Sequence, residues 1–498
     1  MSKAIKYYYD FLSQPSRALW IGMKLSKTPF EGCPVALRKQ EQLTDEYKSI
    51  NRFQKVPAIV DGTFQLGESV SIVRYLSDKG VFSEQLYPKS LEDRARVDEF
   101  LEWQHFNVRM VCGLFFRQVW LLPAKGLAPA PKPEAVKKLI RDVEGNLGLL
   151  ERIWLEKDFL VGDKLTVADI FGASEINQMK LCQYNVNEKQ FPKTAKWLER
   201  VRKATNPYHD EAHSFLYKVS KQAASAKMLQ VGAVDLWTGA LFVFTFPTWG
   251  INTFAGCLAV WIGEPEQLTA MSTPIKFYYD LLSPVSRALW LALKLGNSPI
   301  EYCPIALRKF EQLTEEYKKI NRFQKLPAIV DGDFHLSETI AIIRYLADKG
   351  QFDQKLYPKS VEARARVDEY LEWQHLNIRL ACSLYFRDAW LFPINGIAPK
   401  PKPEQLQKLI DGVETNLGLL ELLWLEKDFL VGQNLTMADI LGSSEINQLR
   451  LCQYQVDGKK FPKVAKWLER VREASNPYHD EGLKFINLKA KQDTVAKL

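Results

Sequence analysis

The chain is poor in cysteine, which limits the covalent and redox chemistry open to it. Its 498 residues include 7 cysteines, and none of them stand in C-x-x-C spacing or in a zinc-binding pattern. This excludes a disulfide-stabilised secreted scaffold and predicts reduced thiols and no metal site. The N-terminal stretch "MSKAIKYYYD" is polar from its start and does not resemble a signal peptide. We therefore expect a cytoplasmic protein.

The chain also lacks runs of lysine and arginine with aromatic residues between them. Its net charge of +8 is a mild excess for this length, so we expect no nucleic-acid partner. Hydrophobic residues make up 46% of the chain and charged residues 25%, which is typical of a globular protein. A chain of 498 residues is too long for one hydrophobic core, so we expect several domains.

What the chain does contain is a near copy of itself. "NRFQKVPAIVDGTF", which begins at Asn51, is repeated as "NRFQKLPAIVDGDF", which begins at Asn321. The offset between the two is 270 residues. "YPKSLEDRARVDEFLEWQH" returns at the same offset as "YPKSVEARARVDEYLEWQH", with no insertion between the copies. A period this long excludes a solenoid and indicates two whole proteins in one chain. We call residues 1 to about 220 copy 1, and residues 271 to about 490 copy 2.

Each copy divides into two parts with different residue patterns. In copy 1, "AIKYYYD" and the segment that ends in "PVAL" are predicted strands. The helical "SRALWIGMKLS" lies between them in the sequence. "VPAIVDGTFQL" reads as a hairpin turning at Asp61-Gly62, and "SVSIVRYLSDKG" as a helix ending at Gly80. The fold class we expect is therefore a small α/β unit, β-α-β followed by β-β-α, with an all-helical unit behind it.

The second part of each copy is helical throughout. "EAVKKLIRDVEGNLGLLERIWLEK" places its apolar residues on one helical face. "LTVADI" has Thr166 and Asp169 at capping-box spacing, which predicts a helix start. The domains expected are 1–82 and 89–221 in copy 1, 274–352 and 359–491 in copy 2, and an apolar spacer at 222–273.

Three short motifs could carry chemistry, and each has a structural alternative. Ser13 in "DFLSQPSRALW" could simply cap a helix, or its hydroxyl could donate to an anion such as a thiolate at that helix N-terminus. Pro57 in "KVPAI" could be an ordinary edge proline, or a cis proline that leaves the Val56 backbone free for an extended peptide. Glu68 and Ser69 could cap the next helix, or bind the ammonium and carboxylate groups of a ligand.

Taken in order, these motifs resemble the cytosolic glutathione transferases of the theta class. "D-[FL]-L-S-x-x-S-R", "K-[VL]-P-A", "E-[ST]" at a helix start and "ARARVDEYLEWQH" occur in this order in both copies, with small substitutions. The resemblance implies a thioredoxin-like domain that holds glutathione and a helical domain that builds most of the electrophile pocket. It also implies dimers, here either a homodimer or the two copies paired within one chain, and glutathione as co-substrate with no further cofactor.

The resemblance also implies which residues form the site. The catalytic residues would be Ser13 and Ser283, which stabilise the glutathione thiolate. The glutathione-binding residues would be Gln42, Lys55, Val56, Pro57, Glu68, Ser69 and Arg109 in copy 1, and Gln312, Lys325, Leu326, Pro327, Glu338, Thr339 and Arg379 in copy 2.

Some positions depart from the family pattern or have a plain structural reading. Many relatives have histidine where this chain has Gln42 and Gln312, and glutamine can donate to a carboxylate but carries no charge. His105 and His375 are interpreted as packed helix residues. Pro284 follows Ser283 directly and biases it to an extended backbone, so we expect copy 2 to differ from copy 1 in turnover more than in glutathione affinity.

Residues 222–273 belong to neither copy. "LWTGALFVFTFPTWGINTFAGCLAVWI", at 236–262, carries no charge and is long enough to span a membrane, but it contains Pro247 and three glycines and has no basic flank. We therefore expect no membrane partner. Met271 restarts the sequence of Met1, so we favour a translated spacer between two tandem genes over a packed linker.

Three functions remain open from the sequence. The first is conjugation of glutathione to small electrophiles, activated by serine, at two sites in one chain. A glutathione-dependent dehalogenase or peroxidase is a variant of that enzyme. A non-catalytic binding or scaffold protein is the rival, although both copies keep the serine, lysine and glutamate that such relatives often lose.

Overall fold

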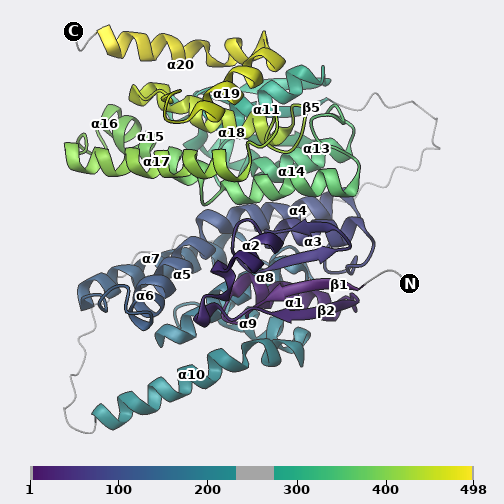
Figure 1. Cartoon of the computed structure of the whole chain (residues 1–498), viewed down its shortest axis with the longest axis vertical. Coiled ribbons are helices and arrows are strands. Elements are labelled where there is room, and N and C mark those ends of the chain that lie inside the picture. Colours follow the sequence, from purple (N-terminus) through teal and green to yellow (C-terminus); the bar gives the residue numbers. More distant parts are fainter. Residues whose placement is uncertain (1–3, 232–273, 496–498) are drawn as a thin grey trace, which may run out of the picture.

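The computed structural model of the chain describes residues 4–231 and 274–495, and the predicted apolar segment at 236–262 lies outside these residues. The two copies lie one above the other, joined along the face where helices α3, α4, α13 and α14 meet (Figure 1). Each copy has a small sheet and a larger helical part. No helix in these two ranges is long and apolar enough to cross a membrane.

The first part of copy 1 is a four-stranded sheet in the order β2-β1-β3-β4. Strands β1 and β2 are parallel, and β3 runs antiparallel to both β1 and β4. The hairpin turns at Asp61 and Gly62, where Gly62 has a φ of 63° that suits glycine. The bounds are β1 (Ile5–Tyr9), α1 (Gln14–Leu25), β2 (Phe30–Pro34), α2 (Asp45–Ile50), β3 (Ala58–Asp61), β4 (Phe64–Leu66) and α3 (Ser69–Asp78).

Copy 2 repeats this sheet in the order β6-β5-β7-β8. The predicted β-α-β and β-β-α order is thus confirmed in both copies, while helices α2 and α12 were not predicted. The bounds are β5 (Ile275–Tyr279), α11 (Pro284–Leu295), β6 (Ile300–Pro304), α12 (Glu315–Ile320), β7 (Ala328–Asp331), β8 (Phe334–Ser337) and α13 (Thr339–Asp348).

The second part of each copy is helical, as predicted. Helix α7 buries Val143, Leu147 and Leu150 of its expected apolar face, and the capping box of Thr166 and Asp169 starts α8. The helices of copy 1 are α4 (Leu91–Trp103), α5 (Val108–Phe116), α6 (Leu122–Ala124), α7 (Pro133–Ile153), α8 (Val167–Gln178), α9 (Pro192–Thr205) and α10 (Tyr208–Val231). Those of copy 2 are α14 (Val361–Gln374), α15 (Ile378–Phe386), α16 (Phe392–Ile394), α17 (Pro403–Leu423), α18 (Met437–Asn447), α19 (Pro462–Ser475) and α20 (Tyr478–Val495).

A buried arginine joins the sheet domain to the helical domain of copy 1. Arg17, on α1, donates to the carbonyl of Phe11 at 2.6 Å and to Gln178 Oε1, on α8, at 2.6 Å. Because α1 packs against α8, the start of α1 is held at the border between the two domains. Arg287 repeats these contacts in copy 2.

The two copies meet through α3 and α4 of copy 1 and α13 and α14 of copy 2, with α4 against α13 and α14 against α3. The contact has near two-fold symmetry. Phe53 stacks on Trp373 at 6.4 Å between ring centroids, and Phe323 stacks on Trp103 at 6.3 Å. Each of these two phenylalanines is therefore packed against a tryptophan of the other copy.

Candidate functional site

Ser13 caps helix α1, as the structural alternative predicted. Its Oγ accepts a hydrogen bond from the backbone N–H of Ser16 at 3.4 Å and donates one to the carbonyl oxygen of Val56 at 3.4 Å. The cap itself uses only an oxygen lone pair, so a ligand that displaces the long bond to Val56 would receive the hydroxyl proton. The hydroxyl is thus beside the backbone that the sequence predicts to hold glutathione.

Ser283 has the same geometry in copy 2 despite the proline after it. Its φ and ψ are −74° and 121°, against −82° and 123° for Ser13. Its Oγ accepts from the N–H of Ser286 at 3.3 Å. The bias that Pro284 imposes is toward the extended backbone that an N-cap adopts anyway, so the proline does not displace the serine backbone. The expected difference in turnover stays a prediction.

The predicted cis prolines are present in both copies, at Val56–Pro57 and Leu326–Pro327. The loop before Pro57 is held by Tyr47, whose hydroxyl donates to the carbonyl of Lys55 at 2.8 Å. Within residues 4–231 and 274–495, no hydrogen bond uses the backbone N–H of Val56 or Leu326. The backbone that we expected to pair with an extended peptide is therefore free to do so.

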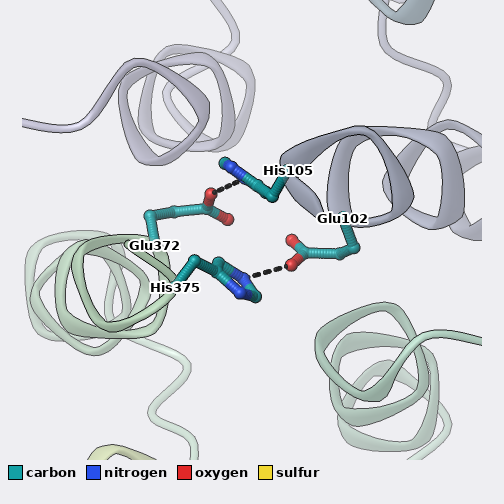
Figure 2. A group of neighbouring side chains, drawn as sticks. All are labelled: Glu102, His105, Glu372 and His375. Atoms are coloured by element: carbon teal, nitrogen blue, oxygen red, sulfur yellow. Dashed lines mark hydrogen bonds and ion pairs between the residues drawn. The ribbon is translucent and has the colours of Figure 1, made fainter. Parts of the chain in front are cut away.

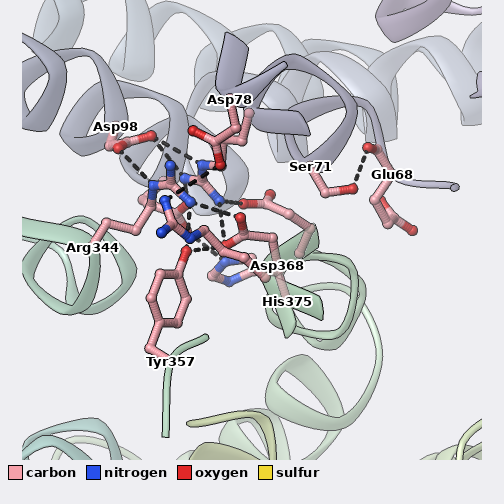
Figure 3. Close-up of polar contacts among 12 residues, drawn as sticks. Glu68, Ser71, Asp78, Asp98, Arg344, Tyr357, Asp368 and His375 are labelled. Atoms are coloured by element: carbon pink, nitrogen blue, oxygen red, sulfur yellow. Dashed lines mark hydrogen bonds and ion pairs between the residues drawn. The ribbon is translucent and has the colours of Figure 1, made fainter. Parts of the chain in front are cut away.

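Glu68 lies at the start of α3 with a left-handed backbone. Its φ is 55°, and that of Glu338 in copy 2 is 64°. Such a φ is costly for a residue other than glycine and is found preferentially at binding sites. The Ser71 hydroxyl donates to the Glu68 carbonyl at 2.8 Å and fixes this turn (Figure 3). Burial raises the pKa of the Glu68 carboxyl, and nearby Lys55 and Arg109 oppose that shift.

The structure brings most of the predicted binding residues of copy 1 into one pocket. Its cavity of about 60 Å³ is lined by Lys55, Val56, Pro57, Glu68, Ser69 and Arg109. The equivalent cavity of copy 2, of about 300 Å³, is lined by Lys325, Leu326, Pro327, Glu338, Thr339 and Arg379. Both contain a lysine, an arginine, a half-buried glutamate and an unpaired backbone N–H, the groups that an extended peptide with both charges requires.

Each pocket also contains residues from the opposite copy, which the sequence did not predict. The copy 1 pocket includes Glu372, Trp373, Leu376 and Asn377, and the copy 2 pocket includes Glu102, Trp103, Phe106 and Asn107. The repeat offset relates these two sets, but nothing in the sequence says that each copy would complete the site of the other. The pairing of the copies therefore shapes both pockets.

Gln42 and Gln312 are not among the residues that line these two cavities. Each has an Oε1 that is buried without a hydrogen-bond partner in the described part of the chain. Ser13 and Ser283 also stand just outside the lining, with Ser13 touching it through Val56. The binding role of the two glutamines and the catalytic role of the two serines stay predictions.

Two buried glutamates support the opposite copy's site. Glu369 of copy 2 accepts a hydrogen bond from the backbone N–H of Gly67, next to Glu68, at 2.7 Å. Glu99 of copy 1 accepts from the backbone N–H of Ser337, next to Glu338, at 2.9 Å. The turn that presents each site glutamate is thus anchored from across the contact.

A buried cluster of glutamate and histidine contributes to the lining of both pockets, and its four side chains are shown in Figure 2. His105 Nε2 lies 2.9 Å from Glu372 Oε2, and His375 Nε2 lies 2.8 Å from Glu102 Oε2. The two imidazole rings stack at 4.5 Å between centroids. Burial lowers the pKa of both histidines and raises that of Glu372 well above its usual range. His105 and His375 are packed, as interpreted, but they also join the two copies.

Family comparisons match both copies. The model for "Glutathione S-transferase, N-terminal domain" matches residues 6–78 and 275–348. The model for "Glutathione S-transferase, C-terminal domain" matches residues 117–204 and 381–474. Each model matches twice, in the order that two tandem copies require.

Individual relatives match the length of a single copy. Glutathione S-transferase theta-1 of Mus musculus is 35% identical over 206 residues, which are 40% of this chain and 83% of the relative. Glutathione S-transferase theta-1 of Homo sapiens is 36% identical over 219 residues, 43% of this chain and 89% of the relative. The solved apo form of human glutathione-S-transferase T1-1 is 34% identical. The match covers 44% of this chain and 91% of the chain in that structure, with a TM-score of 0.41.

Proposed function

The chain belongs to the glutathione S-transferase family, as two theta-class copies in tandem, and from that premise we propose that each copy conjugates glutathione to small electrophiles. The observation that carries the proposal is that six predicted binding residues meet in one pocket in each copy. Glutathione is the co-substrate, and the reaction needs no further cofactor. A cytoplasmic location and a role in detoxification stay predictions.

The proposed binding mode follows from the charges in the pocket. Glutathione is an extended peptide with an ammonium group at one end and a carboxylate at each end. Glu68 takes the ammonium, and the N-terminus of α3 at Ser69 takes the adjacent carboxylate. The N–H of Val56 pairs with the middle of the peptide, and Lys55 is within reach of its charges. Copy 2 offers Glu338, Thr339, Leu326 and Lys325 for the same contacts.

The proposed chemistry is attack of the glutathione thiolate on an electrophilic carbon. A carbon–sulfur bond forms, the bond from carbon to the leaving group breaks, the leaving group departs with the electron pair, and the thiol proton goes to solvent. Ser13 or Ser283 donates a hydrogen bond to the thiolate. A charge-assisted hydrogen bond contributes about 1.5–3 kcal/mol, which lowers a thiol pKa near 8.5 by about one to two units. Proximity of the two reactants supplies the rest of the acceleration.

We also propose that the contact between the copies takes the place of a homodimer contact. Support comes from the residues that each copy adds to the other's pocket, and from the anchoring of the Glu68 turn by Glu369 and of the Glu338 turn by Glu99. A copy without its partner would have lost one wall of its site.

The test uses the full chain, immobilised glutathione and an alkyl halide. We expect retention on the column, elution by free glutathione, and release of halide at the rate at which thiol is consumed. Calorimetric titration should give two glutathione molecules per chain. Retention without turnover of any alkyl halide, reactive ester or organic peroxide would favour the scaffold function, and absence of retention would contradict binding itself.

A further inference from the structure

The Glu–His cluster between the copies has the composition of a metal site. Glu102, His105, Glu372 and His375 each offer one ligand atom, and these atoms all lie within 4.8 Å of one another. A tetrahedral zinc site with bonds near 2.1 Å separates its ligand atoms by about 3.4 Å. Ligand atoms as far as 4.8 Å apart would therefore close by up to about 1.4 Å around an ion, while the 2.8 and 2.9 Å His–Glu pairs would open by about half an ångström.

The cluster as it stands leaves polar atoms unsatisfied. Each imidazole has its Nε2 against a carboxylate, and its Nδ1 is buried without a hydrogen-bond partner in the described residues. Both histidines are buried, His105 with 3% and His375 with 1% of the residue exposed. An ion bound through the Nε2 atoms would leave these Nδ1 atoms without partners, so the case for a site rests on the four gathered ligand atoms.

The buried carboxyl groups around the cluster outnumber the guanidinium groups that contact them. Arg74 donates to Glu372 Oε1 at 2.6 Å and to Glu102 Oε1 at 2.8 Å, which leaves the Oε2 atoms facing the histidines. Arg344 contacts Asp368 and Asp98, the second of which Arg74 also contacts, and Tyr357 lies beside Arg344 (Figure 3). Two guanidinium groups therefore face four buried carboxyl groups, and the Oε2 atoms of Glu102 and Glu372 are left to the histidines.

The other cations that face the histidines are already engaged. Arg109 pairs with Glu175 at 3.7 Å, and Arg379 pairs with Glu445 at 3.6 Å. A divalent cation would bring positive charge to the point where the Glu102 and Glu372 carboxyl groups meet the two stacked imidazoles.

We propose a zinc site between the two copies, with one ligand each from Glu102, His105, Glu372 and His375. Two imidazole nitrogens and two carboxylate oxygens are ligands that Zn²⁺ accepts, and four protein ligands without an open position are typical of a structural site. Arg74 orients both carboxylates from behind, as a supporting residue does around a metal. The ion would link copy 1 to copy 2 and would take no part in conjugation.

The two glutathione pockets provide a path for the ion. His105 and Glu372 are among the residues that line the copy 1 pocket, and Glu102 lines the copy 2 pocket. A cation that enters either pocket therefore meets a ligand of the site among the lining residues. This path depends on the shape of the pockets alone, so the zinc site stands whether or not they bind glutathione.

The test is a titration of the full chain, without a histidine tag, with Co²⁺ after treatment with a chelator. Co²⁺ takes the place of Zn²⁺ and absorbs visible light when it is bound in a four-coordinate site. We expect one equivalent per chain, with the absorption lost when Zn²⁺ is added. If the wild-type chain binds neither Co²⁺ nor Zn²⁺ at one equivalent, the proposal is wrong.

A matched pair of variants locates the site. His105→Gln with His375→Gln should weaken Co²⁺ binding by at least about a hundredfold, since loss of even a supporting residue costs tenfold to a hundredfold. The control is His209→Gln with His213→Gln, a buried stacked pair at 4.1 Å that is outside the cluster. It should bind Co²⁺ as the wild type does. If the first variant does not fold, Glu102→Gln with Glu372→Gln replaces it, and unchanged binding in the folded variant would overturn the proposal.

Discussion

The carboxylate of Glu369, in copy 2, accepts a 2.7 Å hydrogen bond from the backbone N–H of Gly67, in copy 1. Arg52 and Arg366 pair with the same carboxylate at 3.1 and 2.8 Å, so it is held from both copies. Gly67 immediately precedes Glu68, whose backbone has a φ of 55°. A residue of copy 2 therefore fixes the turn that presents the site glutamate of copy 1.

We predict that Glu369→Gln weakens glutathione binding in copy 1 by about tenfold, the effect of losing roughly 1.4 kcal/mol from a charge-assisted hydrogen bond. A two-site calorimetric titration of the full chain measures this. Glu99→Gln is the matched control, because Glu99 makes the mirror contact to Ser337 and should weaken copy 2 alone. Equal weakening of both sites by either variant would contradict the cross-copy role.

The serines give the second prediction. Ser13→Ala combined with Ser283→Ala should lower conjugation by roughly tenfold to a hundredfold and raise the pKa of the bound thiol by about one to two units. The measurement is the pH dependence of thiolate absorbance in the glutathione complex, together with turnover. Ser16→Ala with Ser286→Ala is the control, since both hydroxyl oxygens are buried without hydrogen-bond partners in the described residues. Full turnover and an unshifted thiol pKa in the first variant would mean that the serines are only caps.

Much of each copy could be predicted from the sequence because its signals are local. The Asp61-Gly62 turn, the capping box of Thr166 and Asp169 and the proline after Val56 each act within a few residues. A turn residue or a cap has the same effect in any fold, so its pattern is readable without knowledge of the partner. The same holds for the apolar face of α7.

The contact between the copies could not be predicted in this way. Helix α4 buries Asp98, Glu99 and Glu102, which hydropathy would place in solvent. They are buried because Arg74, Arg344 and Arg322 reach them, two of these arginines from the other copy. Periodicity shows which face of a helix is apolar, but it does not show which charges will find partners. The Glu–His cluster was missed for this reason, since half of it comes from each copy.

The third prediction concerns Glu445, which pairs with Arg379 at 3.6 Å and is buried. Burial raises its pKa from 4.5 to about 7. The folded chain thus keeps a proton that the unfolded chain releases near pH 4.5, so the free energy of unfolding falls as pH rises from 4.5 to 7. A shift of this size corresponds to about 3 kcal/mol.

A glutamine side chain does not titrate in this pH range, so Glu445→Gln should lack this fall in the free energy of unfolding. Its free energy of unfolding should match the wild type below pH 4.5 and exceed it by about 3 kcal/mol above pH 7, measured by urea unfolding across that range. Glu404→Gln, at an exposed position of the same copy, should keep the wild-type pH dependence. If Glu445→Gln follows the wild-type curve, Glu445 does not hold the proton.

The fourth prediction is that the two copies associate without the segment between them. Residues 1–231 and 274–498, produced separately and mixed, should form a one-to-one complex, because the paired charges and aromatic stacks lie within the described residues of each copy. Arg74→Met should weaken the complex by about 3–5 kcal/mol, since it leaves buried carboxylates unpaired. Sedimentation velocity of the mixture measures both effects. Lys24→Met, on α1 away from this contact, should leave the complex unchanged.

The fifth prediction returns to Met271. "MSTPIKFYYD" repeats the start of copy 1 in register, and residues 229–270 resemble neither copy, so we expect the source cell to make two separate proteins. A globular enzyme gains nothing from a long apolar stretch unless that stretch is packed or in lipid. An antibody against the C-terminal "KAKQDTVAKL" should then detect a band near half of the 57.3 kDa mass of the full chain.

A band at the full mass would mean a true fusion, and a full-mass band confined to the membrane pellet would instead support a membrane span at 236–262. If the half-mass product is found, the contact between the copies joins two chains, and the pockets, the Glu369 anchor and the zinc site form only when both are made.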